Sequence, residues 1–208
     1  MSEDPVSSVL LRQLSDLVAG HASIARILSR WDEIGLPDAC LTGSMIAQAK
    51  WNEVFGFDPH HGIVDADIVY FDADDLSGEA EKRAELRIAA LFGDLPVRVD
   101  VKNQARVHLW YAAKFGHAIE PYQSVADAID TYPTTAAAIG LRRRTALEVI
   151  APFGLTDLLH PLVRANATQI TESYFAEKAA RWRRHWPDLE ILPWSEAASR
   201  RHSPDDLI

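Results

Sequence analysis

Residues 65–71 read Asp-Ala-Asp-Ile-Val-Tyr-Phe, with two acids one position apart at the head of an apolar run. Alternate side chains of a β-strand point to the same face, so Asp65 and Asp67 share one face of a predicted strand. Two carboxylates held side by side repel each other unless a cation lies between them. Oxygen ligands suit Mg²⁺ or Mn²⁺, so the pair predicts a metal site. The alternative is that both acids are solvated at the strand end and cap a turn.

The composition is that of an ordinary globular protein: 48% of the 208 residues are hydrophobic and 25% are charged. The formal net charge of −9 makes nucleic acid a possible but not a favoured partner. The single cysteine, Cys40, fits a reducing compartment. The N-terminus lacks the basic-then-apolar order of a signal peptide, and no apolar run reaches the ~20 residues of a membrane span. We therefore predict a cytoplasmic protein with no membrane partner.

A third acid, Asp100, lies in a segment that alternates with a period of two, Val-Arg-Val-Asp-Val-Lys at residues 97–102. If this strand pairs beside the first acidic strand, three carboxylates converge. Three acids can hold two metal ions about 3.5–4 Å apart, the arrangement used for in-line displacement at phosphorus. The alternative is that Asp100 forms an ion pair with Arg98 or Lys102, which share its face.

A Gly43-Ser44 pair follows a short predicted strand at residues 39–42 and precedes a predicted helix. Exposed amide hydrogens at the start of a helix, with the Ser44 hydroxyl, can hold phosphate oxygens. Ser44 could instead simply cap the helix. A triphosphate also needs cations beyond its metal ions, and Lys102 and Arg106, near the end of the third-acid strand, are the candidates.

The remaining patterns predict one domain in three parts. These are a helical hairpin, a core and a C-terminal helical extension, at residues 1–35, 36–166 and 167–208. Further expected elements are a helix with its buried stripe over 76–91, a strand hairpin over 138–141 and 147–152, and a helix over about 171–186 followed by a polar tail.

The order of strand, Gly-Ser, helix, Asp-x-Asp strand and third-acid strand resembles the nucleotidyltransferase superfamily, whose palm is that of DNA polymerase beta. Three segments resemble, more narrowly, a bacterial family of nucleotidyltransferase-like proteins. They are DADIVYFDADDLS (65–77), VKNQARVHLWY (101–111) and APFGLTDLL (151–159), and VRAN (163–166) extends them. The resemblance covers about residues 36–166. It implies an α/β (α+β) fold, with a small mixed sheet flanked by helices.

The resemblance also implies roles for individual residues. Asp65 and Asp67 would ligate the metal, Asp100 would be a further ligand and could take the proton of the acceptor hydroxyl, and Gly43 and Ser44 would hold the terminal phosphates. The implied activity is metal-dependent transfer of a nucleoside monophosphate from a nucleoside triphosphate to an acceptor that the resemblance does not identify. One departure is that Asp65 follows Gly43 by 22 positions, longer than the usual gap in the superfamily.

Two other functions stay open at this point. One is a nucleotide-binding module that has lost turnover, which the long gap after Gly43 favours. The other is an RNA-binding or partner-binding protein that uses the basic segments 142–144 and 181–184. The three acids favour the enzyme over both alternatives.

Overall fold

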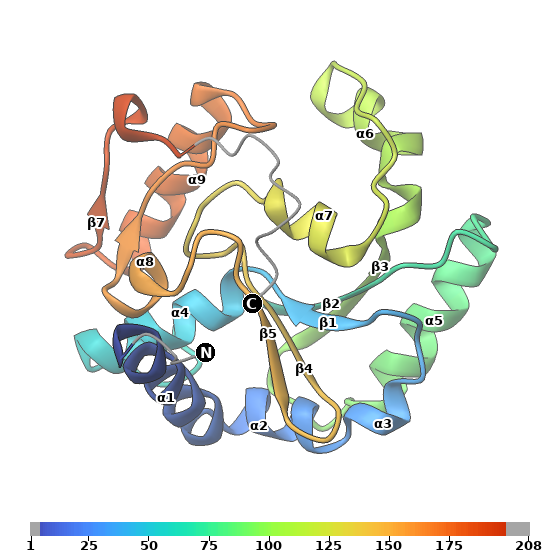
Figure 1. Ribbon diagram of the computed structural model, residues 1–208, viewed down its shortest axis with the longest axis horizontal. Helices are drawn as coiled ribbons and strands as arrows, with labels where there is room; N and C mark the ends of the chain where they lie inside the picture. The colour runs from blue at the N-terminus through green and yellow to red at the C-terminus, as the bar shows by residue number, and fades with distance from the viewer. Residues whose placement is uncertain (1–4, 199–208) are drawn as a thin grey trace.

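A five-stranded mixed sheet forms the centre of the computed structural model, which describes residues 5–198 (Figure 1). The strands lie in the order β3-β2-β1-β4-β5. They are β1 (Cys40–Thr42), β2 (Asp65–Tyr70), β3 (Arg98–Asn103), β4 (Gly140–Arg143) and β5 (Leu147–Ile150). Only β2 and β3 pair in parallel; the other neighbours are antiparallel. The predicted α/β class with a small mixed sheet is therefore confirmed.

The first half of the chain supplies the helices that lie to the left, below and to the right of the sheet in Figure 1. They are α1 (Pro5–Gly20), α2 (Ala22–Ser29), α3 (Trp31–Ile34), α4 (Ser44–Phe55) and α5 (Gly78–Leu91). The helices α1 and α2 pack together at the position of the expected hairpin. The helix α5 connects the parallel strands β2 and β3, and Ser77 caps it by accepting a hydrogen bond from the Ala80 amide.

The two faces of the sheet differ in cover. One face packs into the main hydrophobic core, where Leu41, Ile68 and Val101 are fully buried. The other face carries a smaller apolar cluster in which Cys40 and Val69 meet the short helix α7 (Val125–Asp130). Next to this cluster, the side chains of Asp65 on β2 and Asp100 on β3 are 32% and 27% exposed, so both are in contact with solvent.

The second half of the chain folds onto the sheet from several directions. Its other elements are η1 (Gln104–Arg106), α6 (Val107–Phe115), α8 (Thr156–Leu159), β6 (Leu162–Val163), α9 (Glu172–His185), β7 (Glu190–Ile191) and η2 (Trp194–Glu196). Strands β6 and β7 form a separate two-stranded parallel sheet. The expected polar tail is therefore wrong for residues 187–198, which are folded, while residues 199–208 lie outside the described part of the chain.

Aromatic packing fixes α9 against α4. Trp51 makes edge contacts with Trp182 and Trp186, each with ring centroids 5.0 Å apart. The indole of Trp186 is fully buried and donates a 2.7 Å hydrogen bond to Asn52. This contact sets which face of α9 is turned toward the sheet. Within residues 5–198, no helix is both long enough and apolar enough to cross a membrane.

Candidate functional site

The three acids singled out from the sequence lie on one face of the sheet. Asp67 on β2 is directly opposite Asp100 on β3, and Asp65 is opposite Arg98. Side chains at paired positions of neighbouring strands point to the same side, so Asp65, Asp67 and Asp100 project together. It is the accessible face, beside the cluster covered by α7.

The start of α4 lies against the same carboxylates. Thr42 on β1 pairs with Asp67, which brings the following residue, Gly43, into contact with the acid. A Cβ atom on Gly43 would lie 2.6 Å from Asp67 Oδ2, and Gly43 has a φ of +84°, where side chains are disfavoured. Only glycine allows this approach without displacing the carboxylate.

The long gap between Gly43 and Asp65 does not separate them, because β1 and β2 are antiparallel neighbours. The extra residues form α4 and a loop that packs on α9. A Cβ atom on Gly62 in this loop would lie 2.6 Å from the Trp186 ring, and His61 contacts the carbonyl oxygen of His185 at 3.0 Å. The additional residues between Gly43 and Asp65 therefore serve the contact with α9, and Gly43 still lies next to Asp67.

The first turn of α4 has no side-chain cap. Gly43 itself occupies the cap position, and Ser44 is the first helical residue, half-buried. The alternative in which Ser44 caps the helix is therefore wrong. Backbone N–H groups in a first turn lack partners within their helix, and the helix dipole adds positive potential there. These N–H groups are therefore available to donate hydrogen bonds to an anion at the start of α4.

Burial, together with the neighbouring acids, raises the pKa of Asp67 to about 6. The main cause is burial, and repulsion from Asp65 and Asp100 adds to it. Arg98 and Lys178 act in the opposite direction, because their positive charges favour the ionised carboxylate. Burial and repulsion together thus outweigh these two cations.

Arg98 partly neutralises this charge from the edge of the sheet. Its Nη2 atom donates to Asp100 Oδ2 at 2.8 Å and to Asp65 Oδ2 at 3.1 Å, so one guanidinium bridges two of the three acids. The Arg98 side chain is 64% exposed. A side chain so exposed loses little when it moves, because solvated ion pairs contribute little stability. Arg98 can therefore leave the acids when another cation binds.

Replacing Arg98 by Gln is expected to raise the pKa of Asp67 above its value of about 6, because Arg98 favours the charged carboxylate. The carboxyl carbon chemical shift of Asp67, followed by NMR as a function of pH, measures this change. The matched control is Arg26→Gln, which removes another exposed ion pair, with Asp94 at 3.1 Å. An unchanged Asp67 titration in Arg98→Gln would mean that Arg98 does not screen the acids.

The two cations expected to bind a triphosphate have other contacts in this structure. Lys102 lies on the acid face by its register with Val69 but is half-exposed, with Nζ 3.9 Å from Glu85 Oε2. Arg106 is 16% exposed and is held by Glu81 at 2.6 Å and by the Leu76 carbonyl at 2.9 Å. Their phosphate roles stay predictions, and Lys102 has the looser contact of the two.

The sequence reasoning missed Lys178. This lysine on α9 is placed close enough to Asp67 and Asp65 that their charges favour its protonated form. Burial and the neighbouring Arg181 outweigh them and lower its pKa to about 8. The helix α9 itself was predicted from the sequence. Nothing in the sequence around Lys178 signals that this helix turns the lysine toward β2, more than a hundred residues earlier in the chain.

The carboxylates match Mg²⁺ or Mn²⁺ in ligand chemistry, since all three offer hard oxygen atoms. With the side chains as they stand, no three His, Cys, Asp or Glu residues within 5–198 are positioned to hold an ion together. Arg98 occupies the space between Asp65 and Asp100, so its departure is what a metal would require.

Comparison with known proteins bears on this geometry. The profile of the Nucleotidyltransferase family matches residues 29–191, most of the chain and all of the candidate site. The chain belongs to this family. A solved NMR structure, described as revealing a CCA-adding enzyme head domain, matches with a TM-score of 0.72 and 23% identity, over 88% of this chain and 95% of that one. This likeness shows a shared fold. No curated protein matches the sequence.

Membership of the Nucleotidyltransferase family and the shared fold together support nucleotidyl transfer as the general chemistry. They agree with the resemblance seen in the sequence segments. The family match also extends beyond residue 166 into α9, so the helix that carries Lys178 lies within the matched region.

Proposed function

We propose that this protein transfers a nucleoside monophosphate from a nucleoside triphosphate to a hydroxyl or phosphate acceptor, with Mg²⁺ or Mn²⁺ as cofactor. One observation carries the proposal: Asp67 and Asp100 are direct neighbours on parallel strands, beside Asp65 and against the start of α4. Three acids next to uncapped helical amides provide a site for a metal and a phosphate chain together.

Each residue has a stated part in the proposed reaction with a hydroxyl acceptor. The acceptor oxygen forms a bond to the α-phosphorus, the bond from that phosphorus to the bridging oxygen breaks, and pyrophosphate leaves with the electron pair. Asp100 takes the acceptor proton. Gly43 and Ser44 hold the terminal phosphates through backbone N–H groups. A bound Mg²⁺, held by Asp65, Asp67 and Asp100, would supply positive charge to the phosphates.

Lys102→Ala is expected to weaken binding of a triphosphate by roughly 1.5–3 kcal/mol, the range for hydrogen bonds to charged groups. The loss should be larger than for a monophosphate, because only the longer chain reaches a cation two positions along β3 from Asp100. Calorimetric titration with both ligands measures the difference. Equal losses would show that Lys102 does not contact the phosphate chain, and no loss would leave it as a partner of Glu85.

Arg106→Ala tests whether Arg106, which is paired with Glu81, also contacts the phosphate chain of the donor. A fall in thermal stability without a loss of triphosphate affinity would assign Arg106 to the packing of η1 against α5. A specific loss of triphosphate affinity would assign it to the donor.

The proposed function is tested first with the wild-type protein. Each of the four ribonucleoside triphosphates, labelled at the α-phosphate, is offered with Mg²⁺ together with total RNA or total protein as acceptor. Transfer of label and release of pyrophosphate are the expected results. In parallel, calorimetry measures binding of non-hydrolysable triphosphates with and without Mg²⁺. Absence of Mg²⁺-dependent binding for all four nucleotides would contradict the proposal.

A second candidate function is a nucleotide-binding module without turnover. The observation that favours it is the Arg98 bridge, which places a protein cation between two of the three acids. Mg²⁺-dependent binding without transfer to any acceptor would support this candidate. Binding through the basic segment 142–144 has less support, because Arg142 is already paired with Asp38 and Glu148, each at 2.6 Å.

A further inference from the structure

A basic groove runs along the side of α9 that carries Lys178. Its volume is about 240 Å³, and it is lined by Tyr174, Glu177, Lys178, Arg181 and Arg184. Tyr174, Lys178 and Arg181 are four and three positions apart, so they lie on one face of the helix. Three of the five lining residues are basic and one is acidic.

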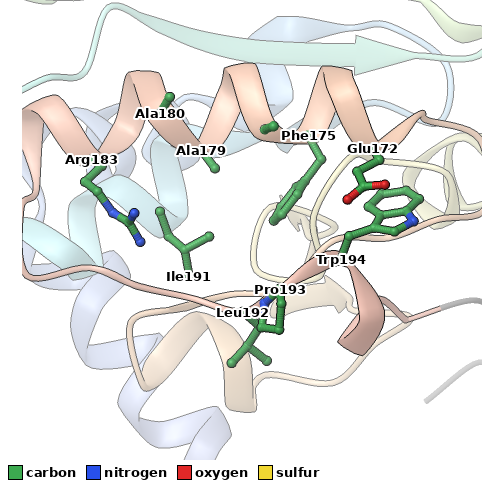
Figure 2. A pocket seen from close by; sticks show the side chains of 10 residues that line it. Glu172, Phe175, Ala179, Ala180, Arg183, Ile191, Leu192, Pro193 and Trp194 are labelled. Carbon is green, nitrogen blue, oxygen red and sulfur yellow. The ribbon is translucent and has the colours of Figure 1, made fainter.

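A different side of the same helix lines a separate, largely apolar cavity of about 270 Å³. In Figure 2, Phe175, Ala179 and Arg183 project from α9 toward the chain segment that carries Ile191 and Trp194. Adjacent arginines of α9 therefore serve different surfaces, Arg181 and Arg184 lining the basic groove and Arg183 the apolar cavity. This division provides a matched control on the same helix.

One residue of the groove, Lys178, also senses the charges of the acid face. Lys178 interacts with both Asp67 and Asp65, although it forms no direct ion pair with either of them among the described residues. The Nζ atom of Lys178 lies 4.6 Å from the centroid of the Trp182 ring, which is itself buried. This contact holds the long side chain in place over the Trp182 ring.

Each side of this junction holds like charges close together. Asp65 and Asp100 repel Asp67, and Arg181 repels Lys178. Within residues 5–198, neither Lys178 nor Arg181 forms an ion pair with a carboxylate. A metal-bound triphosphate carries the complementary charges, with a cation for the acids and anionic oxygens for the basic groove. One ligand can therefore satisfy both.

We infer that the α9 groove binds the phosphate chain of the donor and that Lys178 is its principal cation. The inference deepens the proposed function and rests on it for the identity of the donor. In this arrangement the triphosphate lies between the acid face and α9. Lys178 and Arg181 contact its terminal phosphates.

The experiment removes the charge of Lys178 and keeps its contact with Trp182. Lys178→Met retains an unbranched stem over the ring, and Lys178→Arg retains the charge. The probe is a non-hydrolysable nucleoside triphosphate with Mg²⁺, compared with the corresponding monophosphate, and calorimetry gives the Kd for each. The control is Arg183→Ala, on the same helix but lining the apolar cavity. Thermal melts verify that each variant is folded.

Lys178→Met is expected to weaken triphosphate binding by at least about tenfold, as the loss of a hydrogen bond to a charged group predicts. Monophosphate binding should change much less, Lys178→Arg should retain most of the affinity, and Arg183→Ala should match wild type. An equal loss for monophosphate and triphosphate would overturn the inference, as would a Lys178→Met variant that binds triphosphate normally.

Inorganic tripolyphosphate without Mg²⁺ separates this inference from the proposed function. If the wild-type protein binds tripolyphosphate and Lys178→Met does not, the groove recognises phosphate chains even where Mg²⁺-dependent nucleotide binding fails. A single-stranded oligonucleotide without a triphosphate is the competing anion. Tighter, Lys178-dependent binding of the oligonucleotide than of tripolyphosphate would overturn the assignment of the groove to the donor.

Discussion

Asp67→Asn should abolish Mg²⁺-dependent nucleotidyl transfer and at the same time make the protein more stable at neutral pH. Activity is lost because Asp67 lies at the centre of the acid cluster, opposite Asp100 and against Gly43. Stability rises because the charged carboxylate is repelled by Asp65 and Asp100 and is partly removed from water. Labelled transfer assays and denaturant unfolding of both proteins measure the two effects.

The gain in stability depends on pH in a defined direction. The pKa of Asp67 is raised from 3.8 to about 6, so the folded state holds the proton more tightly than the unfolded state. The cost of ionised Asp67 is absent below the unfolded value, grows between the two values and is complete above pH about 6. It is on the order of 2 kcal/mol, since each pKa unit corresponds to about 1.4 kcal/mol and Asp67 retains some solvent contact.

The matched control for Asp67→Asn is Asp188→Asn, an exposed aspartate in the turn before β7. It should change neither activity nor the free energy of unfolding. The stability gain in Asp67→Asn should grow as the pH rises from 3.8, be complete above pH about 6, and vanish well below 3.8, where both states are protonated. Severe destabilisation of Asp67→Asn at neutral pH would instead show that its carboxylate has an essential structural role.

Gly43→Ala is expected to destabilise the protein and to inactivate the site by moving Asp67. The new Cβ atom would lie 2.6 Å from Asp67 Oδ2, closer than such contacts allow, and the φ of +84° is unfavourable for alanine. Backbone strain of this kind costs about 1–3 kcal/mol, and displacement of the carboxylate adds to it. Unfolding and Mg²⁺-dependent nucleotide binding are the measurements.

Gly56→Ala separates the two causes. Gly56 also has a positive φ, +70°, at the end of α4, but a Cβ atom there meets nothing within 4 Å. This variant should show the backbone strain alone, with nucleotide binding unchanged. If Gly43→Ala behaved in the same way as Gly56→Ala, close approach of Gly43 to Asp67 would not matter for the site.

Much of the fold could be predicted because its signals are local. The alternation around Asp67 and Asp100 gave two strands and the face that each acid occupies, and apolar spacing gave the positions of α5 and α9. The small elements of the second half were harder. Strands β6 and β7 have two residues each, too few for any periodicity to register.

The positions of the candidate site residues could likewise be predicted only where local sequence determines them. Residues carried by a strand or a turn, such as Asp65 and Gly43, have a direction that their neighbours in sequence determine. The contacts of Lys102 and Arg106 were not predictable in this way. Their partners Glu85 and Glu81 lie on α5, and only the packing of α5 beside β3 brings these pairs together.

The sequence by itself determined that Asp65 and Asp67 share one face of their strand, because strand alternation is a property of adjacent residues. The parallel pairing of β2 and β3 then brought Asp100 to the same side of the sheet. The tertiary structure decided which cations face those acids. Lys178 reaches them because Trp182 and Trp186 pack on Trp51 and rotate α9 into one orientation. Such packing depends on shape complementarity between segments far apart in the chain, and no local pattern encodes it.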